Sequence, residues 1–195
     1  MLLPFAQDFA LILGSNSPRR KELLALLGFQ FDVIVKETDE QYDALWEPEA
    51  IVSYIAQQKL KAFTAAERLG KMIITADTIV VDKGRILGKP RSLAEAKATI
   101  ASFSGCKHQV LTAVSIAYQG QETTFVETTD VEFADLNAAE IAFYVEQFQP
   151  LDKAGSYGIQ EWIGYAAIKR IEGSYENVVG LPTARLYQEI KKCLA

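Results

Sequence analysis

Two arginines stand where a helix is expected to begin. The segment LILGSNSPRRKELLALLGF, residues 11–29, passes from an apolar run through Ser15 to Arg19 and Arg20. The first turn of a helix carries unsatisfied amides and positive partial charge, so two cations there oppose the helix dipole. A bound anion reverses that penalty, because backbone amides and guanidinium groups together can surround phosphate oxygens. The alternative is that both arginines extend into water.

A lysine interrupts the apolar side of the next expected helix. A helical wheel places Lys59 of IVSYIAQQKLKAF in the middle of an apolar stripe and Lys61 on the opposite face. A charged group on such a stripe is costly unless it has a partner or extends outward along the surface. Lys59 is therefore either a side chain that reaches water or a cation directed into a cleft.

An aspartate lies inside a second apolar run. Asp77 of IITADTIVVD needs a partner, a metal ion or a chemical role, and Thr78 adds a hydroxyl beside it. The alternative is an aspartate that forms a turn between two strands. The acidic loop KETDEQYD offers carboxylates that could share a metal ion with it, or that are simply solvated: Glu37, Asp39 and Glu40.

Two polar residues in expected loops could contact a ligand. Lys89 precedes Pro90, which favours an extended backbone at the lysine. Gln160 ends the glycine-containing segment DKAGSYGIQ, and its amide both donates and accepts, as the edge of a uracil or thymine base requires. The alternatives are an ordinary loop lysine and an ordinary polar loop residue. His108 is the only histidine, which excludes a multi-histidine metal site, and we interpret it as structural.

The composition narrows the class of protein. The 195 residues carry a net charge of −5, so the chain lacks the basic character of nucleic-acid binders. No apolar run approaches the roughly 20 residues that cross a membrane, and the N-terminal MLLPFAQDFA has no basic region typical of a signal peptide. Two cysteines far apart do not suggest a disulfide framework. We expect a cytoplasmic protein that binds neither nucleic acid nor membrane.

The elements that must position these residues alternate between strands and helices. Strands are expected at 9–13, 31–35, on both sides of residue 77, and in a hairpin turning at 119–121. Capping residues and prolines predict helices that start at 18, 48, 92, 137 and 182, the second of which should run to about Leu69. The pattern predicts one domain, residues 1–195, with a mixed sheet of the α/β or α+β class.

Seven segments in order resemble one known family. SNSPRRKELL, ETDEQ, AQQKLKA, ADTIVV, GKP, LDKAGSYGIQ and GSYENVVGLP follow the order and spacing of the Maf-type nucleoside triphosphate pyrophosphatases, first named as septum-formation inhibitors. The resemblance covers residues 11–186. It implies an α/β fold like that of the inosine-triphosphate pyrophosphatases, with an elongated mixed sheet, flanking helices, and two lobes around a nucleotide cleft.

The resemblance also implies a reaction and assigns roles in it. A nucleoside triphosphate is hydrolysed between its α and β phosphorus atoms with the help of Mg²⁺ or Mn²⁺. Asp77 matches the catalytic proton acceptor, Lys59 and Lys89 match catalytic cations at the phosphates, and Glu40 matches an acidic residue that shares the metal ion with Asp77. The positions that match the substrate-binding residues are Ser15, Arg19, Arg20, Thr78 and Gln160.

Three of these positions distinguish branches of the family. Arg19, Thr78 and Gln160 match the branch that acts on dTTP and UTP, whereas the branch that acts on 7-methyl-GTP has Trp, Gln and an acidic residue there. The expected activity is therefore dTTP/UTP pyrophosphatase, a house-cleaning enzyme. Two alternatives are a broader enzyme for 5-methyl-UTP and pseudo-UTP and a non-enzymatic regulator of septum formation. The resemblance leaves a homodimer open.

Overall fold

The computed structural model describes residues 7–194. Most of the N-terminal segment that we expected not to be a signal peptide, residues 1–6, lies outside the described residues. The chain divides into two compact units. The first contains residues 7–77, 112–127 and 180–194, and the second contains residues 78–111 and 128–179. That the two units act as a single domain around a nucleotide cleft stays a prediction.

The strands form a mixed sheet with the order β2-β1-β3-β5-β6-β7, and β4 pairs with β3. In the first unit, β1 pairs in parallel with both β2 and β3. In the second unit, β4 is antiparallel to β3 and β7 is antiparallel to β6. The strand bounds are β1 Ala10–Leu13, β2 Asp32–Val33, β3 Lys71–Asp82, β4 Arg85–Leu87, β5 Lys107–Tyr118, β6 Gln121–Phe133 and β7 Ile168–Glu172. The mixed sheet confirms the predicted α/β class.

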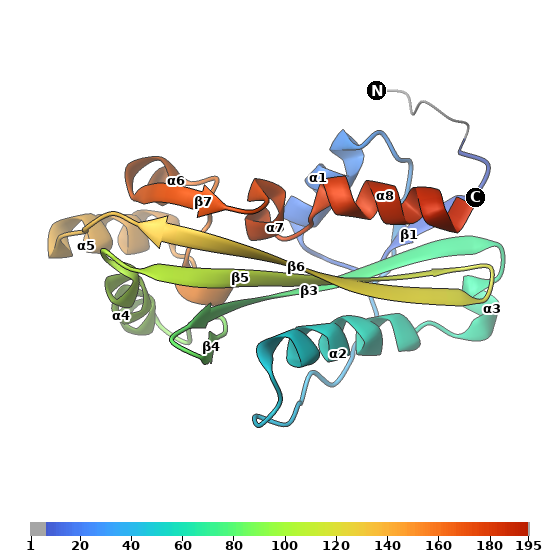
Figure 1. Ribbon diagram of the computed structural model, residues 1–195, viewed down its shortest axis with the longest axis horizontal. Helices are drawn as coiled ribbons and strands as arrows, with labels where there is room; N and C mark the ends of the chain where they lie inside the picture. The colour runs from blue at the N-terminus through green and yellow to red at the C-terminus, as the bar shows by residue number, and fades with distance from the viewer. Residues whose placement is uncertain (1–6, 195) are drawn as a thin grey trace. The chain divides into compact units, whose positions relative to one another are not determined.

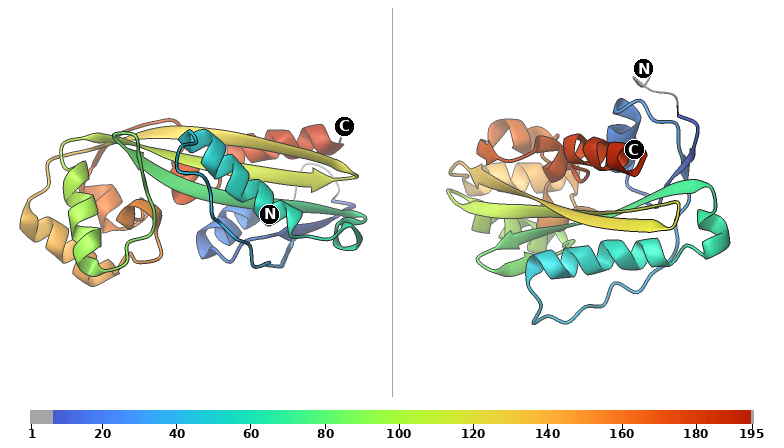
Figure 2. Two further views of the ribbon diagram at one scale, coloured as in Figure 1. Left: turned by 90° about the horizontal axis from the view of Figure 1, so that it is seen from below. Right: turned by 45° about the vertical axis from the view of Figure 1, so that its right-hand side comes forward.

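Helices cover both faces of the sheet in the first unit. Both Figure 1 and the right-hand view of Figure 2 place α2 on one face and α8 on the other. Buried apolar side chains from β1, β3 and α2, among them Ile12, Leu60 and Ile73, hold the α2 face to the strands. The helices of this unit are α1 Pro18–Leu26, α2 Pro48–Lys61, α3 Ala65–Arg68 and α8 Thr183–Leu194.

The second unit has its own apolar core. Phe103, Phe133 and Tyr144 are among its largest fully buried side chains. The helix α4 contacts both α5 and the short 3₁₀ helix η1. The helices of this unit are α4 Leu93–Phe103, α5 Ala138–Phe148, η1 Ala154–Ser156, α6 Trp162–Ala166 and α7 Tyr175–Val179. None of the helices within residues 7–194 has the length and apolarity needed to cross a membrane.

The structure corrects three of the predicted element boundaries. The helix expected over 48–69 ends at Lys61, because Thr64 and Glu67 form a capping box that starts α3. The strand expected over 31–35 contains only two residues of ladder pairing, and both are exposed. The strands expected on either side of residue 77 are one continuous strand, β3, so Asp77 is not in a turn.

His108 is structural, as predicted. It is buried, its Nε2 atom lies 2.8 Å from the hydroxyl oxygen of Tyr157, and its ring stacks on Phe103 at 4.0 Å between centroids. Burial lowers the pKa of His108 to about 4, because the charged imidazolium is poorly solvated there. The imidazole is therefore neutral in the folded protein at neutral pH.

We expect His108 to make the protein sensitive to mild acid. Its pKa is about 4 in the folded state and about 6.5 in the unfolded state, so the unfolded state binds the proton first as the pH falls. The contribution of His108 to the free energy of unfolding should decrease by about 3 kcal/mol in total between pH 6.5 and pH 4. Below pH 4 this contribution should no longer change. Urea unfolding across this range measures the slope, and His108→Phe should have a smaller slope. An equal slope in that variant would exclude the histidine as its origin.

Candidate active site

The loop between β1 and α1 carries Ser15 close to the start of the helix. The amide of Gly14 donates to the carbonyl oxygen of Ile74 at 2.8 Å, which extends the β1–β3 pairing into the loop. A Cβ atom on Gly14 would lie 2.7 Å from Cγ2 of Thr75, so only glycine fits at this approach. Ser15 is buried, and its hydroxyl accepts from the amide of Ser17 at 3.3 Å. Ser17 in turn caps α1, as predicted.

Arg20 ties the start of α1 to two other segments of the first unit. Its Nε atom donates to the carbonyl oxygen of Gly180 at 2.8 Å, and Nη1 donates to the carbonyl oxygen of Ala76 at 2.8 Å and to Ser15 Oγ at 3.2 Å. Burial lowers the pKa of the Arg20 guanidinium, while the negative charge of nearby Asp77 acts in the opposite sense. Its place at the helix start is thus stabilised by protein acceptors even before any anion binds.

Lys59 bridges two carboxylates of the first unit. Its Nζ atom lies 2.7 Å from Asp77 Oδ1 and 2.9 Å from Glu40 Oε1. The side chains of Lys59 and Asp77 are only 18% and 16% exposed, whereas that of Glu40 is 55% exposed, so the Asp77 pair is the better shielded from water. Lys59 is therefore directed inward rather than out along the surface, and Asp77, in mid-strand, has the partner that its burial requires.

The two carboxylates at Lys59 have the right chemistry for a hard divalent cation. Glu40 and Asp77 come from different segments and place oxygen atoms within 3 Å of one positively charged nitrogen. Within residues 7–194, no group of three or more His, Cys, Asp or Glu side chains is arranged to hold a metal ion. Mg²⁺ characteristically takes one or two carboxylates and completes its shell with water and substrate phosphates. The pair at Lys59 fits that pattern.

The remaining predicted site residues are Arg19, Thr78, Lys89 and Gln160. Arg19 is half-buried in the first turn of α1, beside Arg20. Thr78 follows Asp77 in β3 and belongs to the second unit, as do Lys89 and Gln160. Lys89 is exposed after β4, in a segment tied to η1 because the Gly155 amide donates to the carbonyl oxygen of Gly88 at 3.2 Å.

Three residues near Gln160 form a network that sequence reasoning missed. Lys153 Nζ lies 3.1 Å from Glu161 Oε1, and the Tyr144 hydroxyl donates to Glu161 Oε2 and accepts from the Gly158 amide at 3.0 Å. We call Lys153, Glu161 and Tyr144 the Glu161 bracket. A charged residue next to the glycines of LDKAGSYGIQE could have drawn attention to Lys153. Nothing in the sequence, however, connects it with Tyr144 on α5.

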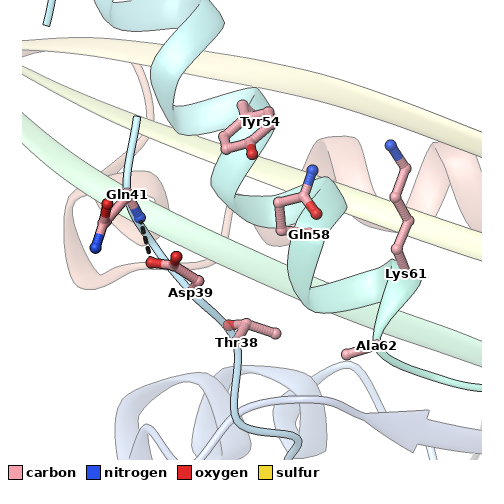
Figure 3. Close-up of a pocket in the computed structure, with 7 residues that line it drawn as sticks. All are labelled: Thr38, Asp39, Gln41, Tyr54, Gln58, Lys61 and Ala62. Atoms are coloured by element: carbon pink, nitrogen blue, oxygen red, sulfur yellow. Dashed lines mark hydrogen bonds between the residues drawn. The ribbon is translucent and has the colours of Figure 1, made fainter. Parts of the chain in front are cut away.

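A polar hollow of about 300 Å³ lies between the acidic loop and α2 (Figure 3). Lys61 lines it, which agrees with the prediction that this lysine faces away from Lys59. Asp39 and Gln41 also line it, whereas Glu40 between them pairs with Lys59. The Asp39 carboxylate accepts a hydrogen bond from the backbone amide of Gln41 at 3.0 Å, so it stabilises the loop instead of pairing with Lys59. The full lining is Thr38, Asp39, Gln41, Tyr54, Gln58, Lys61 and Ala62.

The sequence and the fold of this chain are similar to those of known proteins. The chain is 44% identical over 185 residues to a dTTP/UTP pyrophosphatase of Bacteroides fragilis, which covers 94% of this chain and 96% of the relative. It is also 44% identical to a dTTP/UTP pyrophosphatase of Phocaeicola vulgatus, over 98% of this chain and all of the relative. The Ham1 protein of Staphylococcus aureus has the same fold, with a TM-score of 0.54 at 16% identity over 95% of this chain and 100% of that one. Residues 10–193 match the family described as Maf-like protein. The match to the family over residues 10–193 and the relatives at 44% identity show that the chain belongs to the Maf-like protein family.

Proposed function

We propose that this protein hydrolyses nucleoside triphosphates, dTTP and UTP in particular, to the monophosphate and pyrophosphate. The observation that carries the proposal is the convergence of Arg20, Lys59 and Asp77 in one unit. Relatives 44% identical over nearly the whole chain are named dTTP/UTP pyrophosphatases. A triphosphate needs several cations, and a hydrolase also needs a proton acceptor, which a nucleotide sensor does not.

In the proposed reaction Asp77 receives the proton of the attacking water. The water oxygen bonds to the α phosphorus, the bond from that phosphorus to the bridging oxygen breaks, and pyrophosphate leaves with the electron pair. Negative charge grows on the leaving oxygens, and Arg20, Lys59 and Lys89 are the cations assigned to stabilise it. Lys59 also holds the Asp77 carboxylate in place, with its Nζ atom 2.7 Å from Oδ1. Ser15 and Arg19 complete the contacts to phosphate.

Glu40 and Asp77 would hold a divalent cation, Mg²⁺ or Mn²⁺, when substrate is bound. Such an ion supplies charge neutralisation at the phosphate oxygens and a lowered pKa for bound water. Lys59 must then share its two carboxylate partners, so the pair that it forms with Glu40, which is the more exposed, is the one expected to loosen.

We assign recognition of the base to Gln160, with Thr78 and Arg19 as further specificity residues. The Gln160 Oε1 atom is buried, yet no residue within 7–194 donates a hydrogen bond to it. The N3–H group of uracil or thymine is a donor of the kind that this oxygen lacks. Cytosine presents an unprotonated nitrogen instead, which would leave two acceptors facing each other, and such mismatches are strongly disfavoured in buried sites.

Pyrophosphate release from a panel of triphosphates tests the proposed function. We expect dTTP and UTP to give higher kcat/KM values than CTP, GTP, ATP and 7-methyl-GTP in the presence of Mg²⁺ or Mn²⁺. Including 5-methyl-UTP and pseudo-UTP shows how far the preference extends to modified pyrimidines. A highest value with 7-methyl-GTP would overturn the base assignment, and no release from any of these substrates would overturn the activity.

We expect the activity to depend on a metal ion that Glu40 helps to hold. EDTA should abolish pyrophosphate release, and excess Mn²⁺ should restore it. Glu40→Gln should raise the Mn²⁺ concentration at half-maximal rate by about tenfold, because one of two carboxylate ligands loses its charge. The control is Glu37→Gln in the same loop, since the carboxylates that pair with Lys59 are Glu40 and Asp77. An equal shift in both variants would assign the effect to the loop's overall charge.

We further propose that the protein acts in the cytoplasm, where its nucleotide substrates are found. In the structure Cys106 and Cys193 are free thiols, which is compatible with a reducing compartment. The proposed partner is the nucleoside triphosphate alone, with neither nucleic acid nor membrane involved. Self-association into a homodimer stays a prediction that sedimentation or light scattering can test.

A further inference from the structure

A charged residue is buried in the second unit. The side chain of Lys153 is only 10% exposed. Its Nζ atom lies 2.7 Å from Asp152 Oδ1 and 3.1 Å from Glu161 Oε1. A buried ion pair is seldom the most stable solution, since well-packed apolar residues often stabilise a fold as well or better. A role in function would therefore explain this ion pair better than a role in stability.

Tyr144 holds the second carboxylate oxygen of Glu161. Its side chain is fully buried in the core, and its hydroxyl contacts both Glu161 Oε2 and the Gly158 amide. Burial, together with the neighbouring carboxylate, raises the pKa of the Tyr144 phenol. The hydroxyl consequently keeps its proton and remains the donor to Glu161. Both carboxylate oxygens of Glu161 are thus held, one by Lys153 and one by Tyr144.

The backbone on both sides of Gln160 is fixed by these contacts. On one side, Ile159 is buried in the core, and a Cβ atom on Gly164 would lie 1.7 Å from its carbonyl oxygen, so helix α6 packs directly against it. On the other side, the Glu161 amide donates to the carbonyl oxygen of Gly158 at 3.0 Å. The loop 158–161 is therefore a short turn that the bracket holds by its last residue.

The Gln160 side chain differs from the residues of the Glu161 bracket. Glu161, Tyr144 and the Gly158 amide are all hydrogen-bonded, while Gln160 Oε1 accepts no hydrogen bond from any residue within 7–194. A buried carbonyl oxygen left without a donor costs stability. An acceptor without a donor, in a loop that the Glu161 bracket holds in place, is the arrangement expected of a group that accepts a hydrogen bond from a ligand.

We propose that Glu161, held by Lys153 and Tyr144, is a positioning residue that sets base selectivity by fixing the place of the Gln160 amide. The inference rests on the proposed function, because it assumes that Gln160 contacts the base. Discrimination between bases depends on an acceptor being held where one base offers a donor and another does not. A loop that can shift lets the amide turn and move to pair with either base, so selectivity is lost while the phosphate chemistry is kept.

Steady-state kinetics on bracket variants tests this inference. The variants are Tyr144→Phe, Glu161→Gln and Lys153→Met, with Lys153→Arg as the conservative replacement. The measured quantity is the ratio of kcat/KM for the best nucleotide of the wild type to that for its second best, together with kcat for the best one. The matched control is Glu146→Gln, because Glu146 also pairs with a lysine of the second unit, Lys97, at 2.7 Å, but on exposed helix surfaces. Urea unfolding of each variant measures the structural cost separately.

The bracket variants should lower the selectivity ratio by about tenfold, with kcat for the best nucleotide within about threefold of the wild type. Lys153→Arg should recover part of the ratio, and Glu146→Gln should not change it. Tyr144→Phe removes one hydroxyl and keeps the ring, so it remains informative if the charge variants fail to fold. An unchanged ratio in Tyr144→Phe, with reduced stability, would show that the bracket is only structural and would overturn the inference. A failure of the proposed function would be seen in a different experiment, the panel of triphosphates with the wild-type protein. The selectivity ratio does not assume a particular base, because it is defined by the two nucleotides that the wild type prefers.

Discussion

Asp77→Asn is expected to reduce the rate of pyrophosphate release by about 10²–10⁴-fold, the contribution typical of a positioned general base. Asparagine has nearly the shape of aspartate, so Lys59 Nζ keeps an oxygen partner at the position now 2.7 Å away. The amide, however, cannot take a proton from water and is a poor metal ligand. The loss should therefore appear in kcat, with a small change in the free energy of unfolding, and quenched-flow or coupled pyrophosphate assays measure it.

The same strand offers a matched control for this variant. Asp82 also lies in β3, is fully buried, and neither of its carboxylate oxygens has a hydrogen-bond partner among the residues that the structure describes. Asp82→Asn makes the same side-chain replacement at a position outside the Lys59 cluster, and it should leave the rate within about twofold of the wild type. If both variants lost activity equally, a general disturbance of β3 would be the cause, and Asp77 would have no special role.

Sequence reasoning found Asp77 and Lys59 because burial makes charged residues conspicuous. Each interrupts an apolar pattern, and each needs a partner that the pattern itself cannot name. The structure supplies that partner, since the two side chains are paired with each other across 18 positions of sequence. Caps and prolines likewise fixed the starts of α1, α4 and α5, because these are local interactions within three or four residues.

One error was local and had a signal in the sequence. The helix expected to reach Leu69 stops at Lys61, because the Thr64–Glu67 capping box starts a new helix. The other features that were not predicted depend on tertiary contacts. The acceptors of Arg20 are backbone carbonyls of Ala76 and Gly180, which have no signature in the side-chain sequence. Tyr144 is an ordinary core aromatic by pattern, and only the fold brings its hydroxyl to Glu161.

Arg20→Met is expected to damage both the fold and the reaction. It removes hydrogen bonds to the carbonyl oxygens of Gly180 and Ala76 and to Ser15 Oγ. The free energy of unfolding should fall by about 2–4 kcal/mol, because buried acceptors lose a charged donor. For a chain of this size that corresponds to a decrease in Tm of about 4–16 °C. Activity should fall by more than the unfolded fraction explains, since the cation beside Asp77 is lost as well.

A variant of Arg68 separates the effect on stability from the effect on the reaction, because Arg68 makes structural contacts similar to those of Arg20. Its guanidinium donates to the carbonyl oxygens of Phe63 at 2.9 Å and Leu60 at 2.6 Å and pairs with Glu122, all within the first unit. Arg68→Met should therefore lower Tm by a similar amount, yet at a temperature where both variants are folded it should retain the wild-type KM for triphosphate. Arg20→Met should raise that KM by about tenfold or more, the loss of one charge-assisted contact to phosphate. Equal KM values in the two variants would mean that Arg20 serves only to join α1 to β3 and the Gly180 segment, and that the phosphate-binding role belongs to Arg19 and the lysines.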